Sequence, residues 1–488
     1  MKNEQNKIIE FALKHPTFFT KLISLFYPLS EKIIVSYKNN LDWWYLSKNE
    51  KLPWTISFIE NLDALELIAH RKNNWDWNMY GLSQNKGIFW SVELIEKFID
   101  KWTWGGFESD QDAFPRNYEY GLSENSAIPW SIELIDRFAD KWNWVSLSKS
   151  GDLPWSIGLI NKFIDMWQWD ALSRNENLPW SYVFFEKYKN KWDFISLSGN
   201  EKMTWSNELI CSYINKWDWE LLSSNESLPW SNELIYDYVN RWDWKLLSSN
   251  KSLPWSIELI DKFINKWDWI NLSENTSLPW SVSFFEYYVD KWRWGGWGDE
   301  LSSHYWGLSG NISLPWSIDF FEKYKNNWDF FYLSSNKNFP WSLDLIEKYK
   351  KKWSWHYISK NEGIPWSSEL IEKYKDKWQW DWAFNDGGLS SNKNLPWTVE
   401  LIEKYKDKWL WGWDDFSFDP EKSIYIQIKA GLSVNEKLPW TLDFIEKYVD
   451  KLNWKLLLNK FIYEKLFKFH LNDSLVEDIL SEIIIQKA

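Results

Sequence analysis

A tandem repeat of 25 residues constrains this chain more than any other feature of its sequence. Each unit has the order Leu-Pro-Trp-Ser, an apolar stretch, Trp-x-Trp and Leu-Ser-x-Asn, and the segment that begins at Leu228 restarts at Leu253. Six successive steps are 25 residues long, and five of the others are longer by 11, 15, 11, 6 and 18 residues. In a repeat array each unit contacts only its neighbours, so 488 residues need not mean several domains. The marker tryptophans are Trp54, Trp90, Trp130, Trp155, Trp180, Trp205, Trp230, Trp255, Trp280, Trp316, Trp341, Trp366, Trp397 and Trp440.

Each unit is expected to contain two helices. Ser256 follows the marker tryptophan and is a good N-cap. The apolar residues that follow recur at spacings of three and four, which predicts a helix of about three turns. Asp268 is expected to cap a second, shorter helix that ends at Asn275, where asparagine suits a left-handed conformation. The apolar positions are Leu259, Ile260, Phe263, Ile264 and Trp267.

Acidic and basic residues four apart are expected to stabilise the solvated face of the first helix. Glu258 and Lys262 have the favourable order, with the acid first. The same pair recurs at Glu93/Lys97, Glu369/Lys373 and Glu400/Lys404.

One other repeat architecture shares part of the pattern. Leucine-rich repeats have an extended Leu-x-Leu-x-x-Asn segment, and Leu247–Asn250 keeps the spacing from the last leucine to the asparagine. The residue two before that leucine is Lys245, so the inward alternation is missing. We therefore predict an all-α solenoid of about 14 units over residues 41–454, with a leucine-rich solenoid as the minor alternative. The architecture resembles helical-repeat proteins of the tetratricopeptide kind over these residues, although their units have 34 residues, and no specific family is identified.

The ends of the array and its insertions complete the organisation. Residues 1–40 do not fit the repeat and are predicted to form an N-terminal helical cap, and residues 455–488 are predicted to form a C-terminal cap of two helices. In the first unit the stretch after Trp54 is longer by nine residues. Four further insertions follow the Trp-x-Trp pair of their units, at residues 105–121, 295–307, 381–388 and 412–431. Equivalent positions of a solenoid lie on one edge, so these four loops are expected to project from one side. A glycine before Leu-Ser in these units predicts a backbone angle that other residues resist.

The tryptophans divide into two groups. Three per unit lie at fixed register, and they are predicted to form the core, because one buried tryptophan removes roughly 150–250 Å² from water. Trp297, Trp306, Trp382 and Trp413 lie outside the register, inside insertions. Aromatic side chains on projecting loops are common binding anchors, and packing against the edge is the alternative.

Negative charge concentrates in the same insertions, which together carry −9 of the chain's net −13. An acidic, aromatic edge suits a basic protein or peptide, and a solvating rim is the alternative. The predicted partner-binding residues are Phe107, Asp110, Asp112, Trp297, Asp299, Glu300, Trp306, Trp382, Trp413, Asp414 and Asp415.

Catalytic and metal-binding patterns are absent from the sequence. The five histidines are scattered, Gly295–Gly298 lacks the spacing of a phosphate loop, and Asp414–Asp419 lacks the ligand spacing of a calcium loop. We therefore expect no enzyme activity, no cofactor and no metal. The one cysteine, Cys211, and the lack of a long apolar segment predict a soluble, cytoplasmic protein that does not bind membranes.

The function hypothesis is a scaffold that holds a protein or peptide partner at the insertion edge. The first alternative is a binder of single-stranded nucleic acid or glycan through loop aromatics, although net charge argues against nucleic acid. The second alternative is a structural or particle-associated protein whose arrays pack on each other.

Overall fold

The computed structural model describes residues 2–64, 81–107, 118–119, 121–297, 304–380, 388–419 and 424–487. These residues contain 30 α-helices, four short 3-10 helices and six strands. They form two compact units. Unit 1 consists of residues 1–193, 440–449 and 457–488, and unit 2 consists of residues 194–439 and 450–456.

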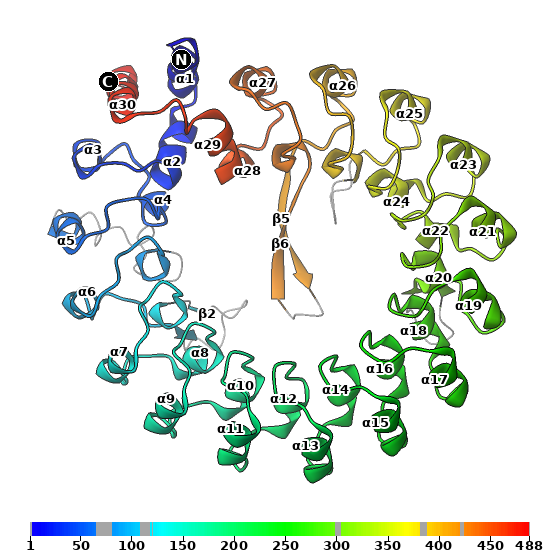
Figure 1. Ribbon diagram of the computed structural model, residues 1–488. Helices are drawn as coiled ribbons and strands as arrows, with labels where there is room; N and C mark the ends of the chain where they lie inside the picture. Colours follow the sequence, from blue (N-terminus) through cyan, green and yellow to red (C-terminus); the bar gives the residue numbers. More distant parts are fainter. Residues whose placement is uncertain are drawn as a thin grey trace. The chain divides into compact units, whose positions relative to one another are not determined.

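The prediction of tandem helical repeats is confirmed. A first helix, here called the marker helix, follows each marker position, and in unit 2 the marker helices form one layer of an arc (Figure 1). The marker helices are α3 (Glu31–Ser36), α5 (Ile56–Ala64), α6 (Val92–Lys97), α7 (Ile132–Arg137), α9 (Ile157–Lys162), α11 (Tyr182–Lys187), α13 (Asn207–Ser212), α15 (Asn232–Asp237), α17 (Ile257–Lys262), α19 (Val282–Tyr287), α21 (Ile318–Lys323), α23 (Leu343–Lys348), α25 (Ser368–Lys373), α26 (Val399–Lys404) and α27 (Leu442–Lys447).

A second helix carries the Leu-Ser motif of each unit, and in unit 2 the second helices line the concave side of the arc (Figure 1). Because this segment is helical, the leucine-rich alternative is wrong. The second helices are α4 (Trp43–Leu46), α8 (Trp144–Lys149), α10 (Trp169–Arg174), α12 (Phe194–Ser198), α14 (Trp219–Ser224), α16 (Trp244–Ser249), α18 (Trp269–Glu274), α20 (Gly307–Gly310), α22 (Phe330–Leu333), α24 (Trp355–Lys360) and α28 (Trp454–Leu457). In four units a 3-10 helix takes this place, namely η1 (Leu82–Gln84), η2 (Leu122–Glu124), η3 (Gly388–Ser391) and η4 (Leu432–Val434).

Side-chain caps define where both helices begin. The Ser256 hydroxyl accepts a hydrogen bond from the Leu259 N–H at 3.2 Å, and the Asp268 carboxylate accepts one from the Asn271 N–H at 2.8 Å. Both caps agree with the predictions. The marker helix is shorter than predicted, because α17 has six residues and ends at Lys262, and the backbone leaves helical geometry at Phe263. The apolar stripe therefore continues to Trp267 through a turn.

The in-register tryptophans pack together and bond the backbone; Trp267 lies in the core, whereas Trp255 and Trp269 are half-buried. Each of the three indole N–H groups in one unit donates to a backbone carbonyl: Trp267 to Ile260 at 3.2 Å and Trp269 to Ile264 at 3.4 Å within the unit, and Trp255 to Asn250 of the preceding unit at 3.1 Å. Trp267 is buried and packs against Trp255 at a ring distance of 5.1 Å. Their polar atoms are therefore used inside the protein, as a structural role requires.

Buried asparagines connect successive units. The side-chain amide of Asn250 donates to the carbonyls of Ser223 at 3.0 Å and Asn225 at 3.3 Å, both in the preceding unit. Its oxygen accepts from the Ser252 N–H at 2.9 Å. The backbone of Asn250 is extended, with φ −66° and ψ 127°, so the predicted left-handed conformation is wrong. Asparagine stands here because its amide spans two units.

The first repeat unit begins earlier than the sequence analysis placed it. Ser30 caps α3, Asp42 caps α4, and the Asn49 amide donates to the carbonyls of Ser24 at 3.0 Å and Tyr27 at 2.8 Å. These are the bonds of an ordinary unit. The predicted N-terminal cap therefore ends near residue 26 instead of residue 40, because Leu29 replaces the marker tryptophan and hides the repeat in the sequence.

Helices from both ends of the chain meet inside unit 1. The remaining N-terminal cap is α1 (Lys2–Lys14) and α2 (Pro16–Phe26), and the C-terminal segment forms α29 (Lys460–Leu466) and α30 (Asp473–Lys487). The α1 residue Phe11 packs against Phe467 at a ring distance of 5.9 Å. Lys7 pairs with Asp443 of α27 at 2.7 Å, and the His15 ring lies 2.9 Å from the Glu446 carboxylate. Helix α1 therefore covers the last marker helix.

Ion pairs between marker helices form a ladder along the array. Lys373 contacts Glu347 of the preceding unit at 2.8 Å, and Lys404 contacts Glu372 at 2.6 Å. The lysines that were predicted to pair within their own helix thus reach the preceding unit instead. The Glu347 carboxylate also accepts a hydrogen bond from the Tyr374 hydroxyl. It therefore contacts two side chains of the following unit, Lys373 and Tyr374.

This ladder predicts acid sensitivity. Lys350, Lys373 and Tyr374 hold the pKa of Glu347 at about 2, and Lys375, Lys404 and Tyr405 hold the pKa of Glu372 at about 2. Because the folded pKa lies below the ordinary value near 4.3, these carboxylates stabilise the fold at higher pH and lose that effect as pH falls towards 2. We expect the melting temperature of Glu347→Gln/Glu372→Gln to fall less than that of the wild type between pH 5 and pH 2. Equal slopes in thermal scans would contradict the role of the ladder.

Among the helices described, none is both long enough and apolar enough to span a membrane.

Candidate interaction edge

The insertions leave their units at one common point. In each of the four units the leucine of Leu-Ser donates its N–H to the residue after the first tryptophan of Trp-x-Trp, and this bond closes the base of the insertion. The bonds are Leu122 to Thr103 at 2.8 Å, Leu308 to Arg293 at 2.8 Å, Leu389 to Gln379 at 2.7 Å and Leu432 to Leu410 at 2.9 Å. The insertions therefore replace the first turn of the second helix.

Three insertions contain antiparallel strand pairs. They are β1 (Gly106–Phe107) with β2 (Tyr118–Glu119), β3 (Gly296–Trp297) with β4 (His304–Tyr305), and β5 (Trp413–Asp419) with β6 (Ile424–Ala430). In unit 2, β5 and β6 extend from the side of the second helices (Figure 1). We expected loops, and in these three insertions strand pairing satisfies the backbone of the paired residues instead.

The glycine before Leu-Ser meets two different requirements. Gly307, Gly388 and Gly431 have φ values of 52°, 54° and 95°, a region that other residues resist, as predicted. Gly121 does not, with φ −143°. A Cβ on Gly121 would lie 2.3 Å from the Gly105 nitrogen, so close backbone approach selects glycine at that position.

Of the predicted partner-binding residues, only Trp306 has a described side chain, and it is 64% exposed. The backbones of five others, Phe107, Trp297, Trp413, Asp414 and Asp415, lie in strands β1, β3 and β5. The remaining residues, Asp110, Asp112, Asp299, Glu300 and Trp382, lie outside the described residues. Their predicted role stays a prediction.

Trp306 is held in place by the preceding unit and by a glycine. The Glu274 carboxylate of α18 accepts hydrogen bonds from the backbone N–H groups of Trp306 and, at 3.0 Å, Gly307. A Cβ on Gly310 would lie 2.7 Å from the Trp306 Cβ, so the ring rests where this glycine leaves room. The exposed ring is therefore anchored through its backbone.

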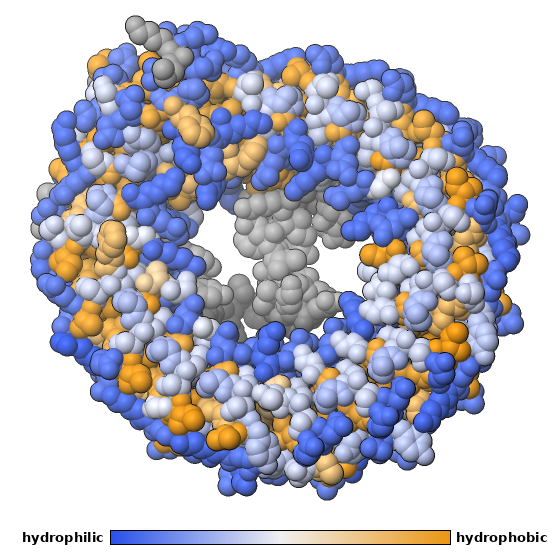
Figure 2. Space-filling view, viewed as in Figure 1, coloured by the Kyte–Doolittle hydropathy of each residue, from blue (hydrophilic) through white to orange (hydrophobic). Residues whose placement is uncertain are grey.

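Further aromatic side chains occupy the equivalent surface of the next two units. Phe331 of α22 stands two residues before its Leu, as Trp306 does, and is 43% exposed. His356 and Tyr357 of α24 follow, and the ring of Tyr357 lies 4.6 Å from that of Phe331. Trp306, Phe331, His356 and Tyr357 are here called the aromatic row. Figure 2 shows apolar residues on the second-helix side of unit 2, beside α20 and α22.

The sequence did not predict the residues that anchor the insertions, nor three of the four members of the aromatic row. The residue between Ser and Asn of Leu-Ser-x-Asn anchors the next unit's insertion: Gln84 donates to the Gly121 carbonyl, Glu274 accepts from Gly307, and Ser391 accepts from the Gly431 N–H at 2.9 Å. Phe331 and His356 lie at a register position that varies among units, with Glu220, Lys245 and Ile270 at the same place. That variation within a strict repeat was the available signal.

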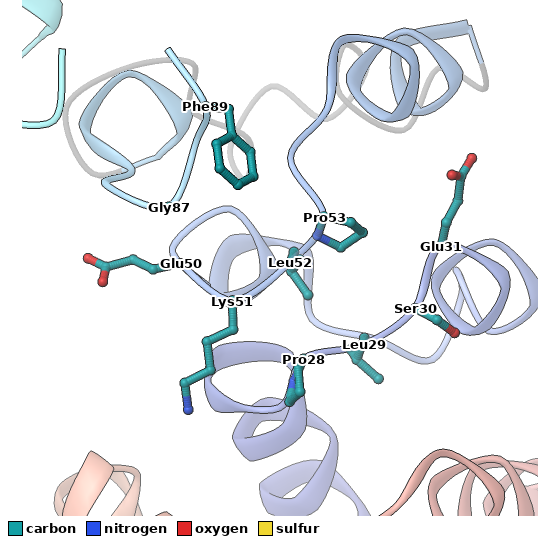
Figure 3. A pocket seen from close by; sticks show the side chains of 10 residues that line it. All are labelled: Pro28, Leu29, Ser30, Glu31, Glu50, Lys51, Leu52, Pro53, Gly87 and Phe89. Carbon is teal, nitrogen blue, oxygen red and sulfur yellow. The ribbon is translucent and has the colours of Figure 1, made fainter. Parts of the chain in front are cut away.

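A second candidate is a surface depression of about 620 Å³ in unit 1, lined by the loops before three marker helices (Figure 3). Pro28, Leu52 and Pro53 form its walls, and Phe89 stands at its rim where most units have proline. In Figure 3 the charged groups of Glu31, Glu50 and Lys51 point away from one another. The depression therefore lacks the convergent polar groups that characterise ligand sites.

Within the described ranges, no three His, Cys, Asp or Glu side chains are arranged to hold a metal ion. Comparison of the chain with models of protein families, with curated proteins and with solved structures finds no match.

Proposed function

We propose that this chain is a non-enzymatic, intracellular α-solenoid scaffold whose insertion edge binds a basic protein or peptide. The observation that carries the proposal is the common exit point of the four insertions, beside which Trp306 exposes its anchored ring. The three insertions of unit 2, at residues 295–307, 381–388 and 412–431, leave equivalent points of one repeat array and can act on one partner together.

The hydrogen bonds of the other tryptophans support this choice of site. The in-register tryptophans donate their N–H groups to backbone carbonyls of their own or the preceding unit, so their polar atoms are already used within the array. Trp306 lies outside that register and keeps most of its surface in contact with solvent. Exposed aromatic residues that are held in place are typical binding anchors, since little side-chain entropy is lost when they bind.

The negative charge of the insertions supports a basic partner. The insertions carry −9 of the chain's −13, so the edge attracts a cationic partner and repels nucleic acid. Attraction of this kind raises the association rate and weakens with salt.

The test is affinity capture from the native host with identification of bound protein by mass spectrometry, followed by binding of the purified partner. The variant carries Asp110→Asn, Asp299→Asn, Asp414→Asn, Asp415→Asn and Trp306→Ala. The matched control is Phe89→Ala, which removes an exposed aromatic ring of unit 1 that lies outside the insertions. We expect one basic protein to bind the wild type and the control directly, and to bind the variant at least tenfold more weakly.

Other outcomes would overturn the proposal. Equal affinity of variant and wild type would place binding elsewhere on the array. Capture of nucleic acid with a steep salt dependence, or of glycan, would favour recognition by loop aromatics. Self-association that grows with concentration, without a captured partner, would favour the structural role.

A further inference from the structure

We infer that Trp306 is a stacking platform for an arginine guanidinium of the partner, with the Glu274 carboxylate as its counter-charge. This inference rests on the proposed function and names the group that the edge recognises.

The chain itself repeatedly places a cation over an indole ring. Arg241 lies 5.4 Å from the ring centre of Trp219, Lys266 lies 5.5 Å from that of Trp244, and Lys291 lies 5.6 Å from that of Trp269. In each pair the cation comes from the following unit. A cation within about 6 Å of an indole face is attracted by the ring quadrupole.

Trp306 has the same kind of ring without such a cation. It stands two residues before its leucine, where the preceding unit has Ile270 and not the cation-covered Trp269, and no cation of the described residues lies over its ring. Its ring edge rests over Gly310, and 64% of the residue stays exposed. An incoming cation can therefore take the place that the repeat fills elsewhere.

Glu274 supplies the charge beside this ring. Both backbone N–H groups of Trp306 and Gly307 donate to its Oε1, and no described donor reaches its Oε2. The carboxylate is held next to the backbone of Trp306, and its Oε2, which takes no donor from the described part of the chain, can accept from a ligand. Asp329 of the next unit adds a second negative charge at the base of the same insertion. Its Cβ lies 3.1 Å from the place that a Cβ on Gly295 would take.

Arginine fits this arrangement better than lysine. Guanidinium is planar and weakly hydrated, so it stacks on an indole face, and its fork of donors reaches a carboxylate at the same time. An ammonium group is strongly hydrated and has no plane to stack.

The experiment measures the fluorescence anisotropy of three labelled peptides, (Gly-Arg)6, (Gly-Lys)6 and (Gly-citrulline)6, with full-length protein. Wild type, Trp306→Ala, Trp306→Phe, Glu274→Gln and the control Phe89→Ala are compared, and circular dichroism checks their folding. We expect the wild type to bind the arginine peptide most tightly and Trp306→Ala to weaken that binding about fivefold, a cation–π effect of moderate size. Trp306→Phe should lie between them, because phenylalanine keeps an aromatic face.

A second variant displaces the ring without removing it. Gly310→Ala puts a Cβ where the Trp306 Cβ lies 2.7 Å away, so the ring has to move. We expect it to weaken binding of the arginine peptide as well, with little change for Phe89→Ala.

The outcomes separate the two proposals. If the wild type binds the arginine and lysine peptides equally and Trp306→Ala changes neither, the platform is wrong while a basic partner remains supported. If the wild type binds none of the charged peptides even at low salt, the basic partner, and with it the proposed function, is wrong.

Discussion

Replacing Trp267 by alanine is expected to destabilise the array by about 3–5 kcal/mol, the usual cost of truncating a large buried aromatic residue. Trp267 is only 4% exposed, and its ring lies 4.7 Å from that of Trp244 in the preceding unit. The loss therefore affects the contact between units as well as the core of one unit. Because repeat arrays unfold unit by unit, the measurement is hydrogen exchange of the neighbouring helices, together with the urea midpoint.

Two further variants show whether this cost reflects the core. Trp267→Phe keeps an aromatic ring but loses the bond to the Ile260 carbonyl, so it should cost clearly less than alanine. Trp306→Ala, which removes an exposed ring, should change stability by no more than about 0.5 kcal/mol. If Trp267→Ala and Trp306→Ala had similar effects, the division into core and surface tryptophans would be wrong.

Replacing Asn250 by alanine is expected to cost about 3 kcal/mol. The substitution leaves the buried Ser223 carbonyl without the amide donor and the Ser252 N–H without its acceptor, whereas the Asn225 carbonyl keeps the bond from the Trp230 indole. A buried polar group that loses its partner costs about 1–3 kcal/mol, and no water replaces the amide easily at a site this closed. Urea unfolding and protection of the amides around α14 and α16 would measure the loss.

The chain offers a matched test in the opposite direction. Ser150 occupies the asparagine position of its unit, where its hydroxyl accepts from the Asp152 N–H at 3.1 Å. Ser150→Asn adds an amide that can reach the carbonyls of the preceding unit, and we expect a gain of about 1 kcal/mol. A loss of stability on this substitution would contradict the account of the asparagine ladder.

The repeat made much of the fold predictable. Ser256 and Asp268 are N-caps in the sequence and in the structure, because capping depends on a few neighbouring residues. The fixed spacing predicted a core role for all three in-register tryptophans, which the buried Trp267 fulfils, whereas Trp255 and Trp269 are half-buried. The first unit was missed because Leu29 and Leu41 replace its tryptophans, although their spacing of 12 residues is that of the repeat.

The sequence by itself determined the helix pairs, their caps, the period and the point at which the insertions interrupt it, since all of these depend on residues close in the chain. The tertiary structure decided what depends on contact between units. Glu274 anchors Trp306 across 32 residues, Asn250 bonds the preceding unit across 27, and Lys7 pairs with Asp443 across 436. Local spacing carries no information about such distances, because they are set by how helices stack and not by which residues follow one another.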